Sequence, residues 1–429
     1  MRKLSFTTWS LLALALALAL GSWGHLSGAA AFTTLDEILK PIGALWVSAL
    51  QLAVLPLVIL KLLAAITGAP SGESVGKLGL RTLLLFLAML LAAGVFTLVV
   101  APPFVALYDA DPATLASLRS TVDIPENVDA EPVSLSAWVS GLVPRNLFAA
   151  AANGDLFPIL LFTAIFAMAV TRLPDEKRLP MATLFQGLSA AMLTVIHWIL
   201  LITPIGVFAL TYPTALRAGL GAAGMLGAFI VLVSGLLLLA TLLLYPVTAL
   251  LGRTPMRTFA RAVAPAQLVA VSTRSSIASL PALIEGATQH LRLPATATAF
   301  VLPLTVAIFK INRTISSTAK LLFLAHVYDV PLSAQTIVVF LATVMLLSFS
   351  SVGVPDGGTA FATLPAYLAA GLPLEVVIVF EATSTIPDIF KTLLNVTGDM
   401  SAAAILSRSR SGEALEPADA GEMVPEGAS

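Results

Sequence analysis

The stretch Thr-Ser-Thr-Ile-Pro-Asp-Ile-Phe-Lys-Thr-Leu-Leu-Asn-Val-Thr-Gly-Asp occupies positions 383–399 and follows an apolar run, so we expect it to continue a membrane helix. On a helical wheel of about 100° per residue, its polar side chains share one stripe roughly 100° wide. They are Asp388, Lys391, Thr392, Asn395 and Asp399. Charges at membrane depth are costly and normally face a cavity or a partner, which predicts a substrate and ion site. The alternative is an Asp388–Lys391 ion pair that only holds helices together, but Asn395 and Asp399 have no local partner and favour the site.

Composition restricts the class of protein. The chain has 429 residues, of which 58% are hydrophobic and 11% charged. Soluble domains carry about 25% charged residues, so this is an all-α polytopic membrane protein in the lipid bilayer. A net charge of -1 gives no support for nucleic-acid binding, and the absence of cysteine excludes disulfides and thiolate metal sites. The 28 glycines and 27 prolines suit the broken helices of a transporter or channel.

The first 253 residues consist mainly of apolar segments. We expect spans at about 11–20, 41–67, 78–105, 157–171, 190–210 and 221–251. The first could be a cleaved signal peptide, but the apolar stretch continues past Leu20 without a clean cleavage site, which favours a retained span. Basic residues after Leu251 and Leu406 predict a cytoplasmic side there, with both termini inside.

The pattern changes after Arg261. Val269–Pro281 is too short to span and rich in hydroxyl groups, as expected of a re-entrant tip. Later apolar segments break at 310–314 and 350–358 and then resume, and a last helix is expected over 375–406, before an acidic tail at 411–429 that we expect to be disordered. A broken segment followed by a spanning helix therefore occurs twice, which indicates inverted repeats with a site at the midplane.

Four short motifs in this order resemble the dicarboxylate/amino acid:cation symporter family. They are Pro204-Ile-Gly-Val-Phe-Ala-Leu210, Thr273-Arg-Ser-Ser276 followed by Leu280-Pro281, Gly353-Val-Pro-Asp-Gly-Gly358, and Leu394-Asn-Val-Thr-Gly-Asp399. The resemblance implies a homotrimeric elevator-type transporter with eight transmembrane helices and two re-entrant helical hairpins. Residues 1–253 would form mostly scaffold, with the span at 78–105 joining the transport domain. The transport domain would be 254–410, comprising hairpin 1 (258–291), a broken helix (295–328), hairpin 2 (333–372) and the last helix (375–406).

The resemblance also assigns roles to single residues. Asp388 would hold a substrate amine, and Lys391 stands where the family usually has an arginine that holds a carboxylate, so the charge is kept but the planar fork is lost. The remaining expected substrate-binding residues are Arg274, Ser275, Ser276, Val354, Pro355, Gly357, Thr392 and Asn395. Asn395 and Asp399 would lie at a sodium ion.

Two departures from the family pattern concern the sodium ions. The family's Asn-Met-Asp-Gly-Thr break corresponds to Phe309-Lys-Ile-Asn-Arg313, and its Thr-Ser pair corresponds to Ala92-Ala93. Both changes remove sodium ligands, and we hypothesise that Lys310 and Arg313 supply tethered cations instead, near Asp399 or Asn395. The alternative places both cations at an aqueous helix end. If sodium is absent, the proton is the obvious coupling ion, and Glu381 is then either its carrier or a solvated interfacial acid.

These features predict secondary active uptake of an acidic amino acid, aspartate or glutamate, across the cell inner membrane, with reduced or altered sodium coupling. Loss of the arginine fork leaves a C4-dicarboxylate or neutral amino acid carrier open, either proton-coupled or uncoupled. The damaged ion site leaves a channel or an uncoupled facilitator open. An enzyme is disfavoured because the sequence has neither HExxH nor GxSxG. We expect no cofactor, and only sodium or a proton as coupling ion.

Overall fold

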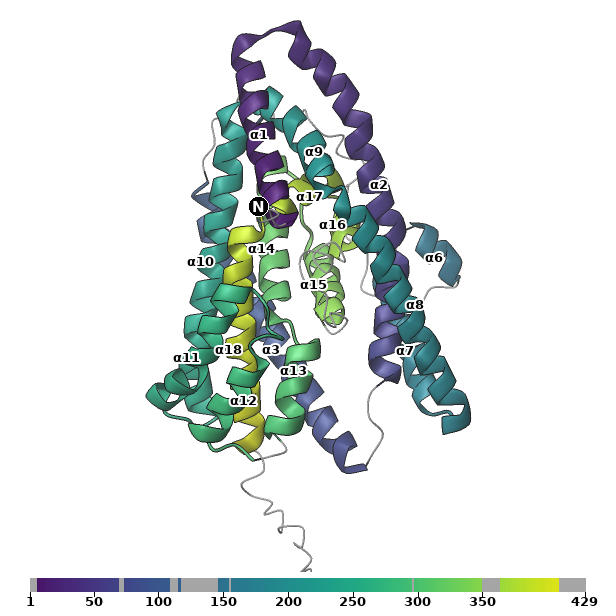
Figure 1. The fold of residues 1–429 in the computed structure, drawn as a ribbon, viewed down its shortest axis with the longest axis vertical. Helices are drawn as coiled ribbons and strands as arrows, with labels where there is room; N and C mark the ends of the chain where they lie inside the picture. The colour runs from purple at the N-terminus through teal and green to yellow at the C-terminus, as the bar shows by residue number, and fades with distance from the viewer. Residues whose placement is uncertain are drawn as a thin grey trace, which may run out of the picture.

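The computed structural model describes residues 6–68, 73–108, 115–116, 146–153, 156–294, 297–348 and 363–408, and these residues form helices without strands (Figure 1). In chain order the helices are α1 (Phe6–Ser27), α2 (Ala30–Thr67), α3 (Glu73–Ala106), α6 (Leu147–Asn153), α7 (Leu156–Thr171), α8 (Asp175–Leu201), α9 (Thr203–Ala218), α10 (Leu220–Leu251), α11 (Met256–Thr273), α12 (Leu280–Gln289), the π-helix η1 (Ala297–Val301), α13 (Leu302–Ile308), α14 (Ile311–Tyr328), α15 (Ala334–Ser348), α16 (Leu364–Ala369), α17 (Leu374–Ala382) and α18 (Thr385–Arg408). The prediction of an all-α fold is confirmed for the described residues.

Several of these helices are suited to crossing a bilayer. Among the described residues, 5 helices are long and apolar enough to do so: α1, α2, α3, α8 and α10. Their apolar side chains also face outward: on α3, Leu83, Leu87, Leu91 and Val95 follow one another at four-residue spacing and are all exposed. A continuous outward apolar stripe has no place in water and fits contact with lipid. The chain is therefore a multi-pass membrane protein.

Two helices expected to be continuous are broken. The span expected over 190–210 divides between α8 and α9, with Ile202 between them, because Pro204 in the first turn of α9 has no amide N–H to extend the preceding helix. The last helix expected over 375–406 divides between α17 and α18 at Thr383-Ser384. Ser384 accepts a backbone hydrogen bond from the Asp388 amide at 2.7 Å, which starts α18 afresh. Both predictions of a single helix are wrong.

The helix break expected at 310–314 is confirmed, and it lies at residues 309–310, between α13 and α14. Phe309 adopts an extended conformation (φ -98°, ψ 112°) between α13 and α14. Its ring is fully buried and stacks on Phe86 of α3 with ring centroids 4.3 Å apart. The backbone therefore leaves the helix inside the protein, where irregular backbone is tolerated.

The segment expected to form hairpin 1 consists of α11 and α12, which lie side by side (Figure 1). Helix α11 ends at Thr273, and the next residue, Arg274, turns the chain with a φ of 53°. The two helices approach closely because Gly286 has no side chain, and a Cβ there would overlap the carbonyl group of Ala262. In the segment expected to form hairpin 2, α15 and α16 are described, while the tip at 349–362 and the tail at 409–429 lie outside the described residues.

Helix α18, yellow in Figure 1, runs among α10, α11, α13 and α14. Polar contacts fix its rotation: Gln267 of α11 donates to the Thr397 hydroxyl at 2.8 Å, and Thr248 of α10 donates to the Ser401 hydroxyl at 2.6 Å. Buried apolar side chains such as Val396 and Met400 pack against the same neighbours. The polar stripe of α18 is thereby turned toward the α13–α14 break.

Candidate functional site

The N-terminal half of the α18 stripe carries a partly exposed ion pair. Lys391 Nζ donates to Asp388 Oδ1 at 2.8 Å, and the Asp388 side chain is 39% exposed while that of Lys391 is 16% exposed. The Thr392 hydroxyl donates to the Asp388 carbonyl oxygen at 2.9 Å, which is a bond within the helix. The ion-pair reading of the sequence is therefore correct in geometry, but the carboxylate remains accessible to an incoming ligand.

A second acid lies beside this pair. Glu381, in the last turn of α17, forms an ion pair through Oε2 with Lys320 of α14. Its Oε1 lies 4.0 Å from Lys391 Nζ and accepts a hydrogen bond from the Ser384 hydroxyl at 3.3 Å. Both partners of the Lys320 pair are buried, at 6% and 8% exposure. Glu381 is thus not a solvated interfacial acid, which removes one of the two readings of this residue.

Asn395, in the middle of the stripe, binds the broken helix. Its Oδ1 accepts the backbone N–H of Asn312 at 3.2 Å, and the Asn312 amide in turn donates to the Lys391 carbonyl oxygen at 3.4 Å. These contacts use an amide side chain to satisfy backbone groups that the break at Phe309 leaves free. Asn395 and the Lys391 carbonyl therefore both hold α18 against Asn312, in the first turn of α14.

The C-terminal half of the stripe carries a dry carboxylate. Asp399 is fully buried, and neither of its oxygens has a hydrogen-bond partner among the described residues. Lys310 lies within electrostatic range of this carboxylate, but its ammonium donates to the Val306 carbonyl at 2.7 Å rather than to Asp399 directly. The Thr305 hydroxyl, also nearby, donates to the Leu302 carbonyl at 2.8 Å.

Arg313 takes a different direction from Lys310. Its guanidinium donates to the carbonyl oxygen of Leu347, at the C-terminal end of α15, at 2.5 Å, and it interacts electrostatically with Glu381. The side chain is buried, at 7% exposure, rather than at an aqueous helix end. The carbonyl end of a helix attracts cations, so Arg313 neutralises the end of α15.

The tips of the hairpins are described only in part. At the tip of hairpin 1 the Ser275 hydroxyl accepts the Ala278 amide at 3.3 Å, and the Ser279 hydroxyl donates to the Ser275 carbonyl at 3.0 Å. Arg274 and Ser275 are half-buried and Ser276 is buried. Val354, Pro355 and Gly357, expected at the other tip, lie outside the described residues.

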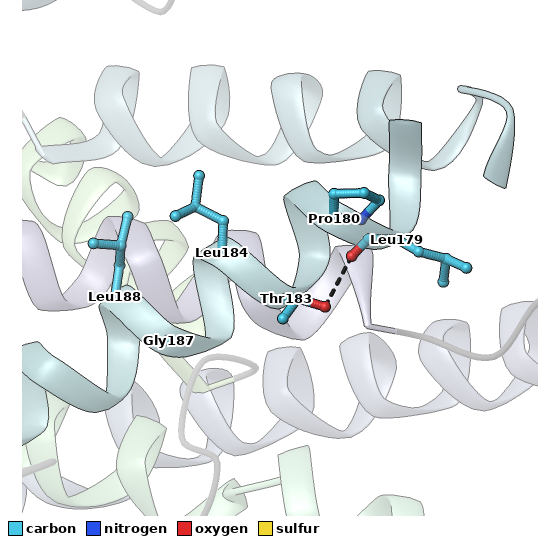
Figure 2. A pocket seen from close by; sticks show the side chains of 6 residues that line it. All are labelled: Leu179, Pro180, Thr183, Leu184, Gly187 and Leu188. Carbon is cyan, nitrogen blue, oxygen red and sulfur yellow. Dashed lines mark hydrogen bonds between the residues drawn. The ribbon is translucent and has the colours of Figure 1, made fainter. Parts of the chain in front are cut away.

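Two hollows in the described part of the surface lie away from the stripe. A groove of about 750 Å³ follows the outer face of α8, and Figure 2 shows that its lining is apolar apart from Thr183, which donates to the Leu179 carbonyl at 3.0 Å. A cavity of about 420 Å³ lies between α9 and α17, lined by Lys40, Arg217 and Glu375 among others. Among the described residues, no group of three or more His, Asp or Glu side chains could hold a metal ion.

Two residues of the site, Lys320 and Asn312, were not predicted from the sequence. Lys320 is a charged residue inside the apolar stretch 315–325, a signal strong enough to have marked it. The role of Asn312 depends on which neighbour its backbone meets, and no local pattern shows that. At the position of the family's Thr-Ser pair, Ala93 is buried on α3 while Ala92 is exposed.

Comparisons with known proteins agree with one another. The sequence profile of the sodium:dicarboxylate symporter family matches residues 6–409. The chain is 28% identical over 417 residues to the proton/glutamate-aspartate symporter of Escherichia coli (strain K12), covering 95% of this chain and 94% of that protein. It is 29% identical over 381 residues to the proton/sodium-glutamate symport protein of Bacillus subtilis (strain 168), covering 87% and 86%. It is 25% identical over 383 residues to C4-dicarboxylate transport protein 1 of Pseudomonas aeruginosa, covering 86% and 82%.

Proposed function

This chain belongs to the sodium:dicarboxylate symporter family, and from that premise we propose that it takes up an acidic amino acid by secondary active transport, with a tethered lysine in place of one coupling sodium ion. Its relatives are symporters for glutamate, aspartate and C4-dicarboxylates, so the chain is a transporter and not an enzyme. The bacterial relatives and the apolar helices support a place in the inner membrane. We also propose that both termini are cytoplasmic.

The single observation that carries the choice of substrate is the Asp388–Lys391 pair. An amino acid brings an ammonium group and a carboxylate, and the pair offers one group of opposite charge to each, with Asp388 39% exposed. A C4-dicarboxylate has no group for Asp388 and would meet like charge there. Relatives of both substrate classes exist, so it is the pair that favours an amino acid over a C4-dicarboxylate, and the glutamate and aspartate symporters among the relatives support an acidic one.

The proposed ion site is the Asp399 half of the stripe. A co-transported sodium ion needs several oxygen ligands. Asn395 Oδ1 already accepts a hydrogen bond from the backbone N–H of Asn312, and the side chain of Ile311 contributes no ligand. A buried carboxylate without hydrogen bonds needs a positive charge nearby, and Lys310 supplies one. We propose that the ammonium of Lys310 performs there the electrostatic work of sodium, leaving a proton gradient as the energy source.

The moving body in this proposal is the C-terminal half with two earlier helices. Helix α3 packs on α14, and α10 packs along α18 and is hydrogen-bonded to it at Thr248. These contacts suggest that α3 and α10 travel with α11–α18, while α1, α2 and α7–α9 form the fixed scaffold. The transport domain would then begin at α10 rather than at residue 254. A homotrimer assembled through the scaffold helices completes the proposal.

Counterflow with the purified protein in liposomes tests the proposed substrate. Vesicles loaded with unlabelled L-aspartate should accumulate labelled L-aspartate above the outside concentration, and unlabelled succinate or L-serine should compete about tenfold less well than L-aspartate. Accumulation driven by succinate but not aspartate would move the assignment to a C4-dicarboxylate carrier. Equilibration of the label without any accumulation would indicate a channel-like pathway instead of a carrier.

A further inference from the structure

Three cations surround one buried acid beside the proposed substrate site. Glu381 forms an ion pair with Lys320, lies 4.0 Å from Lys391 and interacts electrostatically with Arg313. Counting Asp388, this group holds three positive and two negative side chains. The proposed function uses Asp388 and Lys391 but leaves Lys320 and Glu381 without a role.

The two oxygens of Glu381 have different surroundings. Oε2 is held by Lys320, whose ammonium also lies 5.5 Å from the centre of the Tyr367 ring. The Tyr367 hydroxyl donates to the Ser317 carbonyl at 3.1 Å, so this ring is itself fixed on α14. Oε1 accepts one long hydrogen bond, from the Ser384 hydroxyl at 3.3 Å, and lies 4.0 Å from Lys391 Nζ. Oε2 is therefore fixed by its ion pair with Lys320, whereas Oε1 can accept a stronger hydrogen bond than the one from Ser384.

The interruption between α17 and α18 makes this arrangement possible. In an unbroken helix the ten-residue separation of Glu381 and Lys391 would place their Cα atoms about 15 Å apart. The turn at Thr383-Ser384, together with two long side chains, brings the Lys391 ammonium within 4.0 Å of Glu381 while it still donates to Asp388 at 2.8 Å. Lys391 thus stands between two carboxylates and needs only a small rotation to exchange one for the other.

Resting on the proposed function, we propose that Glu381 is a positioning residue that receives Lys391 when a substrate amine takes Asp388. Before binding, Lys391 neutralises Asp388. An incoming ammonium group replaces it there, and Lys391 moves onto Glu381 Oε1 and the substrate carboxylate, so that no buried charge is left unpaired. The exchange makes Glu381 a determinant of selectivity for substrates that carry an amine.

A substrate without an amine does not need the exchange. An ammonium group has three donors, so Lys391 can hold Asp388 and a succinate carboxylate at the same time. Removing the charge of Glu381 also makes the site more positive, which favours a dianion such as succinate. The loss of Glu381 should therefore weaken aspartate binding and leave succinate binding equal or tighter, a pair of opposite effects.

The test compares two variants that both lack Lys320, because removing Glu381 alone would leave the Lys320 ammonium buried without its partner. In the reference variant Glu381 still faces Lys391 at 4.0 Å and interacts electrostatically with Arg313. The variants are Lys320→Met and the double variant Lys320→Met/Glu381→Gln, which differ only in the charge at Glu381. Binding of L-aspartate and of succinate is measured by calorimetry on the purified full chain, with thermal melting to show that both variants fold. Variants whose melting transition is lost are replaced by the same pair in nanodiscs.

We expect the double variant to bind aspartate about tenfold more weakly than Lys320→Met, while its succinate affinity is unchanged or higher. A Glu381 that only held α17 against α14 would change both affinities by the same factor or neither, and either result would overturn the proposal. Failure of the proposed function looks different, because the unmodified protein would then bind no aspartate at all.

Discussion

The two ends of the α18 stripe carry the same chemical group in opposite surroundings. Asp388 is 39% exposed and accepts a hydrogen bond from Lys391 at 2.8 Å, whereas Asp399 is fully buried and has no hydrogen-bond partner among the described residues. They lie about 16 Å apart along the helix. A carboxylate that keeps water and a mobile partner can be taken over by a ligand. A buried carboxylate with a tethered cation in electrostatic range has a counter-charge supplied by the protein itself.

This difference suggests that the two ends of the stripe have different roles. At the Asp388 end, charge is arranged so that a substrate can replace one partner of an ion pair at little cost. At the Asp399 end, Lys310 is held by the Val306 carbonyl and is not positioned to leave. We therefore assign substrate recognition to the first end and structural charge balance to the second.

The largest expected effect is at the substrate end. Replacing Asp388→Asn removes the negative charge that faces the substrate amine and leaves Glu381 as the only carboxylate beside Lys391, so uptake of L-aspartate should fall about 100-fold or more in kcat/KM. Uptake into liposomes measures this. Glu375→Gln, an exposed acid on α17, is the matched control and should stay within about twofold. A nearly active Asp388→Asn protein would contradict the assignment of the substrate end.

The next effect concerns the other end. Lys310→Met removes the cation near Asp399, which leaves a buried carboxylate without compensation. Uptake should fall about tenfold in sodium-free buffer and should stay low when sodium is added, because Asn395 Oδ1 is already hydrogen-bonded and Ile311 offers no oxygen ligand for the ion. Lys177→Met, at an exposed position in α8, controls for the loss of a lysine. Uptake close to that of the unmodified protein would show that Lys310 does not supply a charge that the site needs.

A gain in affinity is expected from Lys391→Arg. The guanidinium can donate to a carboxylate through two parallel N–H groups, which an ammonium cannot do. Affinity for L-aspartate should rise about three- to tenfold, with little change for L-serine, which lacks the second carboxylate. Calorimetry on both ligands measures the ratio. An equal change for aspartate and serine would place Lys391 away from the acidic side chain of the substrate.

The smallest effect concerns the packing of the dry end. A Cβ on Gly398 would lie 3.3 Å from Ile311 Cγ2 and 3.6 Å from Phe309 Cε1, at the break between α13 and α14. Gly398→Ala should therefore have a free energy of unfolding about 1 kcal/mol lower than Gly227→Ala, because both gain helix propensity and only Gly398→Ala is mildly overpacked. Gly227→Ala, where nothing lies within 4 Å, should not destabilise the protein. Thermal melting of the two variants in detergent compares them.

Sequence periodicity predicted the stripe and the α13–α14 break because both follow from local residue types. Five polar residues on one helical face and a Lys-Ile-Asn-Arg interruption of an apolar run can be read without knowing their neighbours. The break before α18 could also have been predicted from the sequence, because Ser384 is a good N-cap residue and Pro387 lies in the first turn of the new helix. The apolar run at 376–380 made one continuous helix the more obvious prediction.

Tertiary neighbours decide the rest, and no pattern in the chain shows them. The sequence placed Lys310 and Arg313 together as substitutes for sodium, but their side chains diverge: Lys310 donates to the Val306 carbonyl within electrostatic range of Asp399, and Arg313 donates to the Leu347 carbonyl. The pairing of Glu381 with Lys320 joins residues that lie on two helices. Proline likewise fails as a guide by itself, since Pro41 and Pro56 lie inside α2 without ending it.

The most direct test of the division between the two ends is a sodium titration of L-aspartate binding to the unmodified protein. Calorimetry in potassium- and sodium-free buffer, with sodium then replacing choline up to about 100 mM at constant ionic strength, gives the affinity at each concentration. If Lys310 fills the ion position, the affinity should change by less than about twofold over the series. A steep rise in affinity with sodium, tenfold or more, would contradict the account and return the Asp399 end to a bound metal ion.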